Sequence, residues 1–358
     1  MTNNNELFIE HIINKSQSGE VVEKLILQNL SCDDFLLEGV QCLELVFENI
    51  TFNRVDFKDC DLSYCSFENC KFNECKFDSL TTTMSNFADC IFNNVLFYKC
   101  NLIEGFFKCS VFHESNIQES FFSRVSLIDF KILGSSLTLV SFGECKSEKV
   151  VFKDTNTHQM LLVKFNFTTL ELINTVLDNL IALECDAQNI DLSNFHLAKC
   201  QFSYGNLANT NFKNSNLDMV SFKSCNLNGC DFSSASLNYA LVVDATCHNT
   251  NFCDVKMHFG NFQGSDLFNC KFDRSDFYMT QFQKANFINC SFRNCLSLLL
   301  CNFSYSTLTG TDFSGTKFER TTFHLVKDDN VSYDGKLGII GDDKDLLEAD
   351  LWMTKFYE

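Results

Sequence analysis

Evenly spaced cysteines are the first residues of this chain that could do chemistry. Thiolates bind zinc or form disulfides, so such a set could be a metal site or a disulfide framework. One set has four cysteines spaced five residues apart: Cys60, Cys65, Cys70 and Cys75. A second set mixes the two commonest zinc-ligand types: Cys247, His248, Cys253 and His258. Either set is functional only if the fold brings its side chains to one point.

The cysteine spacing is one phase of a longer repeat. A large apolar residue stands two positions after each cysteine of the first set, and the same five-residue beat runs from Phe47 to Phe292. Elsewhere Ser, Ala, Thr or Gly takes the cysteine position. A position that accepts all of these selects for small volume, so we expect free thiols that act as buried apolar fillers.

The residue before the large one is often Asn or Asp, as in NTNFKNSNLDMVSFKSCNLNGCDFSSASL, which begins at Asn209. Over roughly residues 22–325 the pattern resembles the A-(D/N)-L-x-x signature of the pentapeptide repeat family, in a Phe-rich and Cys-rich form. A period of five fits neither a helix nor an ordinary strand and calls for a solenoid. The resemblance implies an all-β, right-handed quadrilateral parallel β-helix. Four pentapeptides would make one square coil, with the large and small residues inside.

Three segments follow from this assignment. Residues 1–21 are expected to form an N-terminal helical cap, residues 22–325 the β-helix, and residues 326–358 an acidic linker with a C-terminal helix. Caps are expected because an open β-helix exposes strand edges. The apolar residues of the C-terminal helix would make it a lid, or a dimerisation helix as the resemblance implies for some relatives: Leu346, Leu347, Leu351, Trp352 and Phe356.

A square coil argues against a metal site and against catalysis. Consecutive pentapeptides would lie on different walls, so neither candidate set could converge on a tetrahedral zinc ion. Cysteines twenty residues apart, such as Cys70 and Cys90 or Cys270 and Cys290, would be close enough for a disulfide, although free thiols are the expectation. The sequence has no phosphate-binding glycine loop, HExxH or GxSxG motif. We therefore expect no enzyme activity, no catalytic residues and no cofactor.

Composition agrees with a solenoid. The chain has 40 phenylalanines, one tryptophan and no proline, as expected if nearly every backbone N–H donates to a neighbouring strand. No stretch approaches the roughly 18 apolar residues of a membrane span, and the first residues do not resemble a signal peptide. A cytoplasmic location is expected, and translocation into a host cell as a secreted effector scaffold stays open.

The net charge of −18 raises a specific alternative. Several members of the family resemble B-DNA in width and charge, bind DNA gyrase or topoisomerase IV, and protect the enzyme from quinolones. Part of this charge lies in the C-terminal segment, and elsewhere Lys and Arg alternate with Asp and Glu. The DNA-mimic interpretation, with no direct binding of nucleic acid, therefore rests mainly on the resemblance.

The leading prediction is a non-enzymatic, protein-binding rod or scaffold. Its basis is a set of apolar residues in outward phases, which would mark a partner surface. Four of them should lie together on one wall: Leu161, Val163, Ile181 and Leu183. Ile173 belongs to the preceding or following wall, and Ile103, Phe106, Phe121 and Ile128 continue the tendency upstream. The alternative is that the register of the repeat is disturbed here and that these residues point inward.

Overall fold

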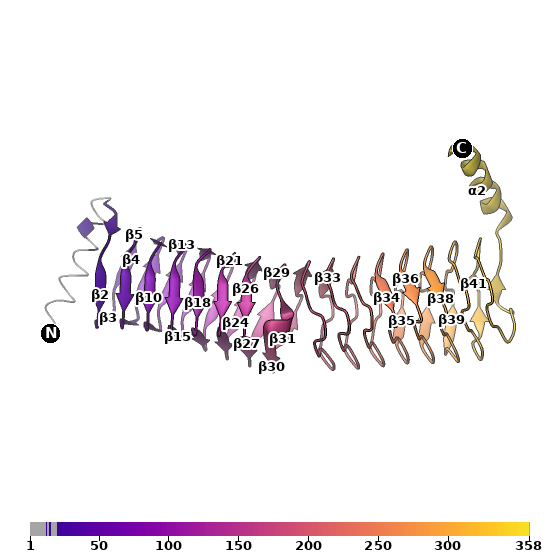
Figure 1. Ribbon diagram of the computed structural model, residues 1–358, viewed down its shortest axis with the longest axis horizontal. Coiled ribbons are helices and arrows are strands. Elements are labelled where there is room, and N and C mark those ends of the chain that lie inside the picture. Colours follow the sequence, from indigo (N-terminus) through magenta and orange to yellow (C-terminus); the bar gives the residue numbers. More distant parts are fainter. Residues whose placement is uncertain (1–11, 13, 16–19, 358) are drawn as a thin grey trace. The chain divides into compact units, whose positions relative to one another are not determined.

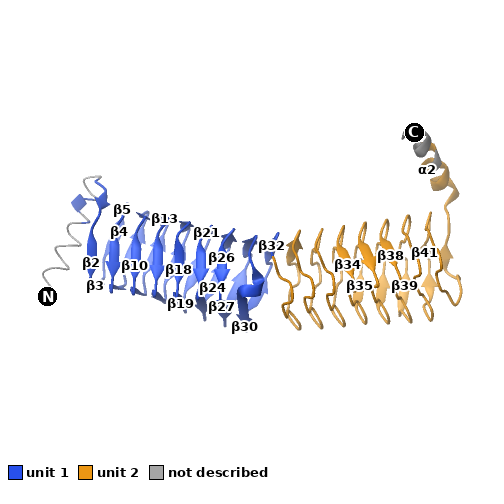
Figure 2. Ribbon diagram, viewed as in Figure 1, with its two compact units in different colours: residues 1–185 blue, residues 186–358 orange. Residues whose placement is uncertain are grey.

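The computed structural model describes residues 12, 14, 15 and 20–357. The chain forms an all-β parallel β-solenoid of about 16 turns with one helix near its C-terminus (Figure 1). It divides into two compact units, Met1–Cys185 and Asp186–Glu358 (Figure 2). In the first unit, three-residue strands recur every five residues and stack into four walls, which are named here after their first strands.

Two walls follow each other along the chain at the start of each coil. The β1 wall contains β1 (Val22–Glu23), β5 (Gln41–Leu43), β9 (Asp61–Ser63), β13 (Thr81–Thr83), β17 (Asn101–Ile103), β21 (Phe121–Ser123), β25 (Ser141–Gly143), β29 (Leu161–Val163) and β32 (Ile181–Leu183). The β2 wall contains β2 (Ile26–Gln28), β6 (Val46–Glu48), β10 (Ser66–Glu68), β14 (Asn86–Ala88), β18 (Phe106–Lys108), β22 (Ser126–Ile128) and β26 (Lys146–Glu148).

The other two walls complete the coil. The β3 wall contains β3 (Ser31–Asp33), β7 (Thr51–Asn53), β11 (Lys71–Asn73), β15 (Ile91–Asn93), β19 (Val111–His113), β23 (Lys131–Leu133), β27 (Val150–Lys153) and β30 (Leu170–Ile173). The β4 wall contains β4 (Leu36–Glu38), β8 (Asp56–Lys58), β12 (Lys76–Asp78), β16 (Leu96–Tyr98), β20 (Asn116–Gln118), β24 (Ser136–Thr138), β28 (Asn156–His158) and β31 (Val176–Asp178). A 3-10 helix, η1 (Phe167–Thr169), replaces the next strand of the β2 wall.

Pairing is parallel, and each residue faces the residue twenty positions away. Phe72, for example, pairs with Phe52 on one side and Phe92 on the other. The chain turns each corner through a residue with positive φ, such as Asn69 or Glu74. The repeat of five thus consists of a short strand and a left-handed corner, and four such steps return the chain to the same wall.

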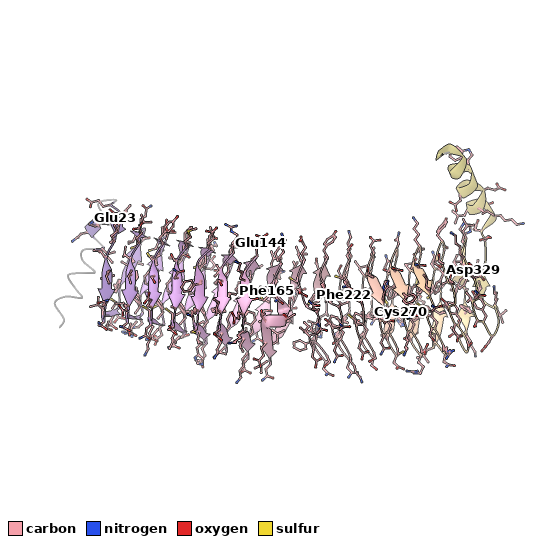
Figure 3. All side chains as sticks on the ribbon, in the orientation of Figure 1. Glu23, Glu144, Phe165, Phe222, Cys270 and Asp329 are labelled. Carbon is pink, nitrogen blue, oxygen red and sulfur yellow. The ribbon has the colours of Figure 1, made fainter. Side chains whose placement is uncertain are left out.

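Stacked rings fill the interior. Phe52, Phe72, Phe92 and Phe112 form a continuous ladder with ring centroids 4.3–4.9 Å apart. Each ring thus stacks on the ring twenty residues away. All side chains named here are buried, because the rings of one coil pack against the rings above and below. The stick view in Figure 3 labels Phe165, which is buried, and Glu144, which lies on the outer surface.

The second unit has the same five-residue repeat but fewer strands. Its elements are β33 (Gln201–Ser203), β34 (Thr246–His248), β35 (Lys256–His258), β36 (Asp266–Phe268), β37 (Asp276–Tyr278), β38 (Asn286–Ile288), β39 (Ser297–Leu299), β40 (Phe318–Glu319), β41 (Thr321–Thr322), β42 (Ile339–Ile340) and α2 (Lys344–Tyr357). Between them, single parallel bridges such as Asn211 with Asp231 hold the coils together.

The break in the beat between Phe292 and Phe303 is a one-residue bulge. Asp276 pairs with Ser297, a step of 21 residues in place of 20, and the exposed Leu296 lies immediately before β39. The extra residue is therefore accommodated at the corner before β39. Parallel pairing also continues past residue 325, through the bridge of Asp312 with Ser332 and the pairing of β41 with β42.

Most of the predicted N-terminal cap, residues 1–21, lies outside the described residues. Residues 12, 14 and 15 are helical, and Ile12 is buried. At the other end, the predicted C-terminal helix is present as α2. Among the described residues, no helix is long and apolar enough to cross a membrane.

Candidate functional site

The cysteines are distributed as the repeat predicts. All are free thiols, and all except Cys109 and Cys253 are buried. The Cys70 thiol donates to the carbonyl of Phe47 at 3.3 Å, so even its weak donor is satisfied by backbone. Burial raises the pKa of Cys75 to about 11 and that of Cys100 to about 12, which disfavours the reactive thiolate.

The second candidate set, which consists of Cys247, His248, Cys253 and His258, does not converge on one point. His248 Nε2 lies 2.9 Å from Asp266, and His258 Nε2 lies 2.9 Å from Asp276, but β34 and β35 belong to different sheets. Cys247 is buried in the interior. Across residues 12, 14, 15 and 20–357, no three His, Cys, Asp or Glu side chains are grouped to hold a metal ion.

Four of the predicted patch residues lie together on the outside of the β1 wall. Leu161 pairs with Ile181 and Val163 pairs with Leu183, on the neighbouring strands β29 and β32. All four side chains are half-buried, whereas Leu162 and Ala182 between them are each only 1% exposed. The register of these two strands is thus regular, and the four residues point outward. Their role as an interaction patch stays a prediction.

Ile173 requires a correction. It pairs with Lys153 on the β3 wall, two corners along the chain from the β1 wall, and not on the preceding or following wall. The sequence analysis misplaced it because each pentapeptide advances the chain by one wall, and residues 163 and 173 are two pentapeptides apart. Phe106 and Ile128 lie on the β2 wall, while Ile103 and Phe121 share the β1 wall with Leu161.

A groove of about 920 Å³ runs along the β1 wall next to Leu161. Its apolar sides are Ile103, Phe121, Leu139 and Leu161. Ser123 and Ser141 also line the groove, and their side chains are small. Phe121 is 54% exposed and Leu139 is 46% exposed, so the groove presents apolar surface to the outside. We call this feature the β1 groove.

Leu139 is a groove residue that the sequence analysis missed. It occupies a corner position with φ of 56°, where a bulky apolar side chain is unfavourable. Most corner residues of this unit are Asn, Asp, Glu, Lys or Arg. The signal available in the sequence was an apolar residue at a corner position, a position that is polar in most other pentapeptides of this unit.

The C-terminal helix α2 is attached to the last coils through Asp350. Tyr305 donates to the carboxylate of Asp350 at 2.8 Å, and Nε2 of the fully buried His324 lies 3.2 Å from the same oxygen. The backbone N–H of Asp343 donates to Nδ1 of His324 at 3.2 Å. Hydrogen bonds from Tyr305 and His324 lower the pKa of Asp350 and keep it ionised.

The predicted cap residues on α2 differ in how far they are exposed. Leu346 is 43% exposed, Leu347 is half-buried and Trp352 is 61% exposed. The side chains of Leu351 and Phe356 lie outside the described residues. Leu346 and Trp352 of α2 are thus exposed. Both the lid role and the dimerisation role of α2 stay predictions.

Comparison with known proteins places the repeats in a family. The family model described as pentapeptide repeats (eight copies) matches five segments of the chain, residues 45–78, 196–233, 230–267, 261–296 and 297–326. Of the solved structures, HetL, a pentapeptide repeat protein involved in heterocyst differentiation regulation in the cyanobacterium Nostoc sp. strain PCC 7120, is 13% identical. It covers 88% of this chain and 96% of its own, with a TM-score of 0.21.

Two further solved structures are similar to this chain. Full-length QnrB1, a plasmid-mediated fluoroquinolone resistance protein, is 15% identical and covers 92% of this chain and 99% of its own, with a TM-score of 0.19. Rfr23, a pentapeptide repeat protein from the cyanobacterium Cyanothece 51142, is 19% identical and covers 43% and 90%, with a TM-score of 0.18. No curated protein matches this chain.

The profile match agrees with the geometry. A five-residue beat, inward large and small residues, and a twenty-residue pairing step all occur in the matched segments 45–78 and 196–326. Residues 45–78 and 196–326 are therefore pentapeptide repeats of that family.

Proposed function

We propose that this chain is a non-enzymatic scaffold that binds a protein partner through the outer surface of the β1 wall. The observation that carries the proposal is the apolar lining of the β1 groove together with the adjoining patch of Leu161, Val163, Ile181 and Leu183. Outward positions of a solenoid wall are free to be polar, so a run of apolar side chains there has no role in the core of its own unit. Contact with a partner would remove that surface from water.

The charged side chains that line the β1 groove support a binding role. Enzyme sites need acid, base or nucleophile groups that converge in a concavity. The β1 groove is lined by Lys99, Glu119 and Arg124, but these side chains are engaged in ion pairs along the wall. Lys99 lies 3.9 Å from Glu119, and Arg124 lies 3.2 Å from Glu104. Such neutralised pairs flank an apolar surface and provide no free nucleophile.

A crosslinking experiment tests the proposal. A photo-crosslinking phenylalanine analogue at position 121 should capture a protein in cells that express the chain. The same analogue at Tyr64, which is 52% exposed and lies outside the groove, is the matched control. Adding Leu161→Lys and Leu183→Lys should abolish capture while the circular dichroism spectrum is unchanged. Equal capture from both positions, or capture that survives the lysines, would contradict the proposal.

Binding of DNA gyrase or topoisomerase IV by DNA mimicry is the second candidate, and the acidic net charge of −18 is what favours it. Duplex DNA carries about one charge per 1.7 Å along its axis. On this chain, acids are paired with bases one coil away, as in Asp34 with Arg54 at 2.5 Å and Glu144 with Lys164 at 3.2 Å. A mimic would therefore have to use acids outside these pairs.

A gyrase supercoiling assay, with and without ciprofloxacin, decides between the two candidates. Inhibition or drug rescue by the purified chain would support the mimic. If Leu161→Lys with Leu183→Lys removed that effect, the partner of the β1 wall would be the topoisomerase itself. No effect on supercoiling at any protein concentration would remove gyrase from consideration.

A homodimer through α2 is tested separately by truncation before Lys344, which should leave only monomers if α2 forms the contact.

A further inference from the structure

Some columns of corners in the second unit follow a clear residue preference, and others depart from it. Corner residues have positive φ, which costs bulky L-residues free energy and suits Asn, Asp and Gly. One column of corners follows this preference throughout: Asn189, Asn209, Gly229, Asn249, Asn269, Asn289, Gly310 and Asn330. A residue type that goes against this preference therefore needs a reason outside the backbone.

A different column of corners is apolar: Met219, Tyr239, Phe259 and Met279, with φ between 52° and 62°. These side chains are 52%, 50%, 40% and 37% exposed, respectively. The rings of Tyr239 and Phe259 are stacked, with centroids 4.9 Å apart and planes 6° apart. We call this feature the apolar corner column. It combines an unfavourable backbone conformation with exposed apolar area, and neither is needed to fill the core of the unit.

We propose that the apolar corner column of one copy of this chain docks into the β1 groove of a second copy. This rests on the proposed function, in that it names the occupant of the groove. The column lies along a corner and is convex, whereas the groove is concave and apolar. Side chains of both surfaces recur once per coil, about every 4.8 Å, so the column and the groove match in spacing along the solenoid.

The lining of the groove suits such an insertion. Phe121, Ser141 and Leu161 follow one another on adjacent strands of the β1 wall, so a small residue lies between two large ones. A Cβ placed on Gly143, the next outward residue of the same strand, would meet no atom within 4 Å. Ser141 is thus a small rung between the larger Phe121 and Leu161, and Gly143 beside it leaves open space.

Charges near both surfaces favour an uncharged occupant. Beside the column, the carboxylate of Asp218 accepts hydrogen bonds from Ser236 and Asn238, and His258 lies 2.9 Å from Asp276. Beside the groove, Arg124 is paired with Glu104. The charged groups named here thus have hydrogen-bond or ion-pair partners within their own unit. An apolar column fits this environment better than a charged segment.

The two surfaces differ, so the contact is heterologous. A heterologous contact leaves one groove and one column free on a pair of copies, and further copies can add until a ring closes or a filament grows. Oligomers larger than a dimer are therefore expected at high concentration. This property separates the proposal from a symmetric dimer.

Sedimentation of the full chain over a wide concentration range tests the proposal. The column variant is Tyr239→Asn with Phe259→Asn, which should fold well because Asn suits a positive φ. The groove variant is Ser141→Arg, at a half-buried outward position. Tyr204→Asn is the matched control, since Tyr204 is an exposed corner tyrosine in another column. The wild-type chain and the control should form oligomers beyond the dimer, and each variant alone should be monomeric.

Mixing the variants is the decisive measurement. An equimolar mixture has one intact column and one intact groove, so it should form a 1:1 dimer and nothing larger. A wild-type chain that stays monomeric, association that survives in either variant, or a mixture that stays monomeric would overturn the proposal. If the wild-type chain is monomeric while position 121 captures a different protein in cells, only this inference fails and the proposed function stands.

Discussion

The two units run on the same five-residue beat with different local backbones. In the first unit most pentapeptides contain a three-residue strand, as in β11 and β15. In the second unit many contain a turn closed by a hydrogen bond, as from the N–H of Thr210 to the carbonyl of Leu207 at 3.1 Å. The corner residue Asn209 has φ of 60° at the third position of that turn, as in a type II turn. The inward residues thus specify the four-sided coil. The outward residues specify whether each pentapeptide forms a strand or a turn.

Asn and Asp before the large residue explain much of this difference. In the second unit, Oδ1 of Asn211 accepts the N–H of Lys213, and its amide donates to Asp191 one coil away. This local hydrogen bond competes with an extended strand. A bulky residue directly after the large inward residue favours a strand instead. Phe268 and Tyr278 each end a strand, although Asp begins both strands.

The largest expected effect is alkaline unfolding of the thiol-rich coils. Burial raises the pKa of Cys60, Cys65 and Cys75 to about 11, above the usual 9.0. The unfolded chain therefore loses these protons first. The resulting stability is fully present below pH 9 and is lost as the pH rises toward about 11, at about 1.4 kcal/mol per pKa unit for each thiol.

The comparison within the first unit sharpens this prediction. The coils around Ser110, Ser115, Ser120 and Ser135 carry serine in the same inward position and are the internal control. Hydrogen exchange as a function of pH should show that the cysteine coils open first, together with a rise in thiolate absorbance. Uniform protection up to pH 11 would contradict it.

The next effect is the loss of one ring from each phenylalanine ladder. Phe92 stacks on Phe72 and Phe112, and Phe272 stacks on Phe252 and Phe292. Replacing either fully buried ring with Ala should cost about 3–5 kcal/mol. Since coils contact only their neighbours, hydrogen exchange should increase mainly in the unit that carries the change. A much larger cost in one unit would show that the two ladders are not equivalent.

Much of the fold could be predicted from the sequence because large apolar residues recur every five residues with few interruptions. Phe72 and Phe92 are twenty residues apart, and nothing but a four-sided coil stacks them. The outer surface was harder, because its residues are set by local hydrogen bonds and by contacts outside the unit. Leu139 and Tyr239 occupy a phase that the repeat leaves to polar residues, so their importance emerged only from their exposure. Ile173 was misplaced because each pentapeptide advances the chain by one wall, and Ile173 lies two pentapeptides after Val163.

A matched pair of asparagines tests the turn explanation with a smaller effect. Asn211→Ala removes two hydrogen bonds in a turn of the second unit and should cost about 1 kcal/mol. Asn116 has the same phase on strand β20, and its buried Oδ1 has no hydrogen-bond partner among the described residues. Asn116→Val should therefore be neutral or slightly stabilising, because Val suits a strand. Chemical denaturation of both variants gives the comparison, and equal destabilisation would contradict the turn explanation.

The smallest effect is expected from the ion pairs that connect corners of adjacent coils. Arg274 makes two hydrogen bonds to Asp254, at 2.8 Å and 2.7 Å, whereas Arg124 reaches a single oxygen of Glu104 at 3.2–3.3 Å. All four side chains are at least one-third exposed, so water and salt screen both pairs. Arg274→Gln should cost less than about 1 kcal/mol, and Arg124→Gln should cost less still. Both costs should shrink in high salt, and a larger cost for Arg124 would show that the two-bond geometry in the second unit does not strengthen the pair.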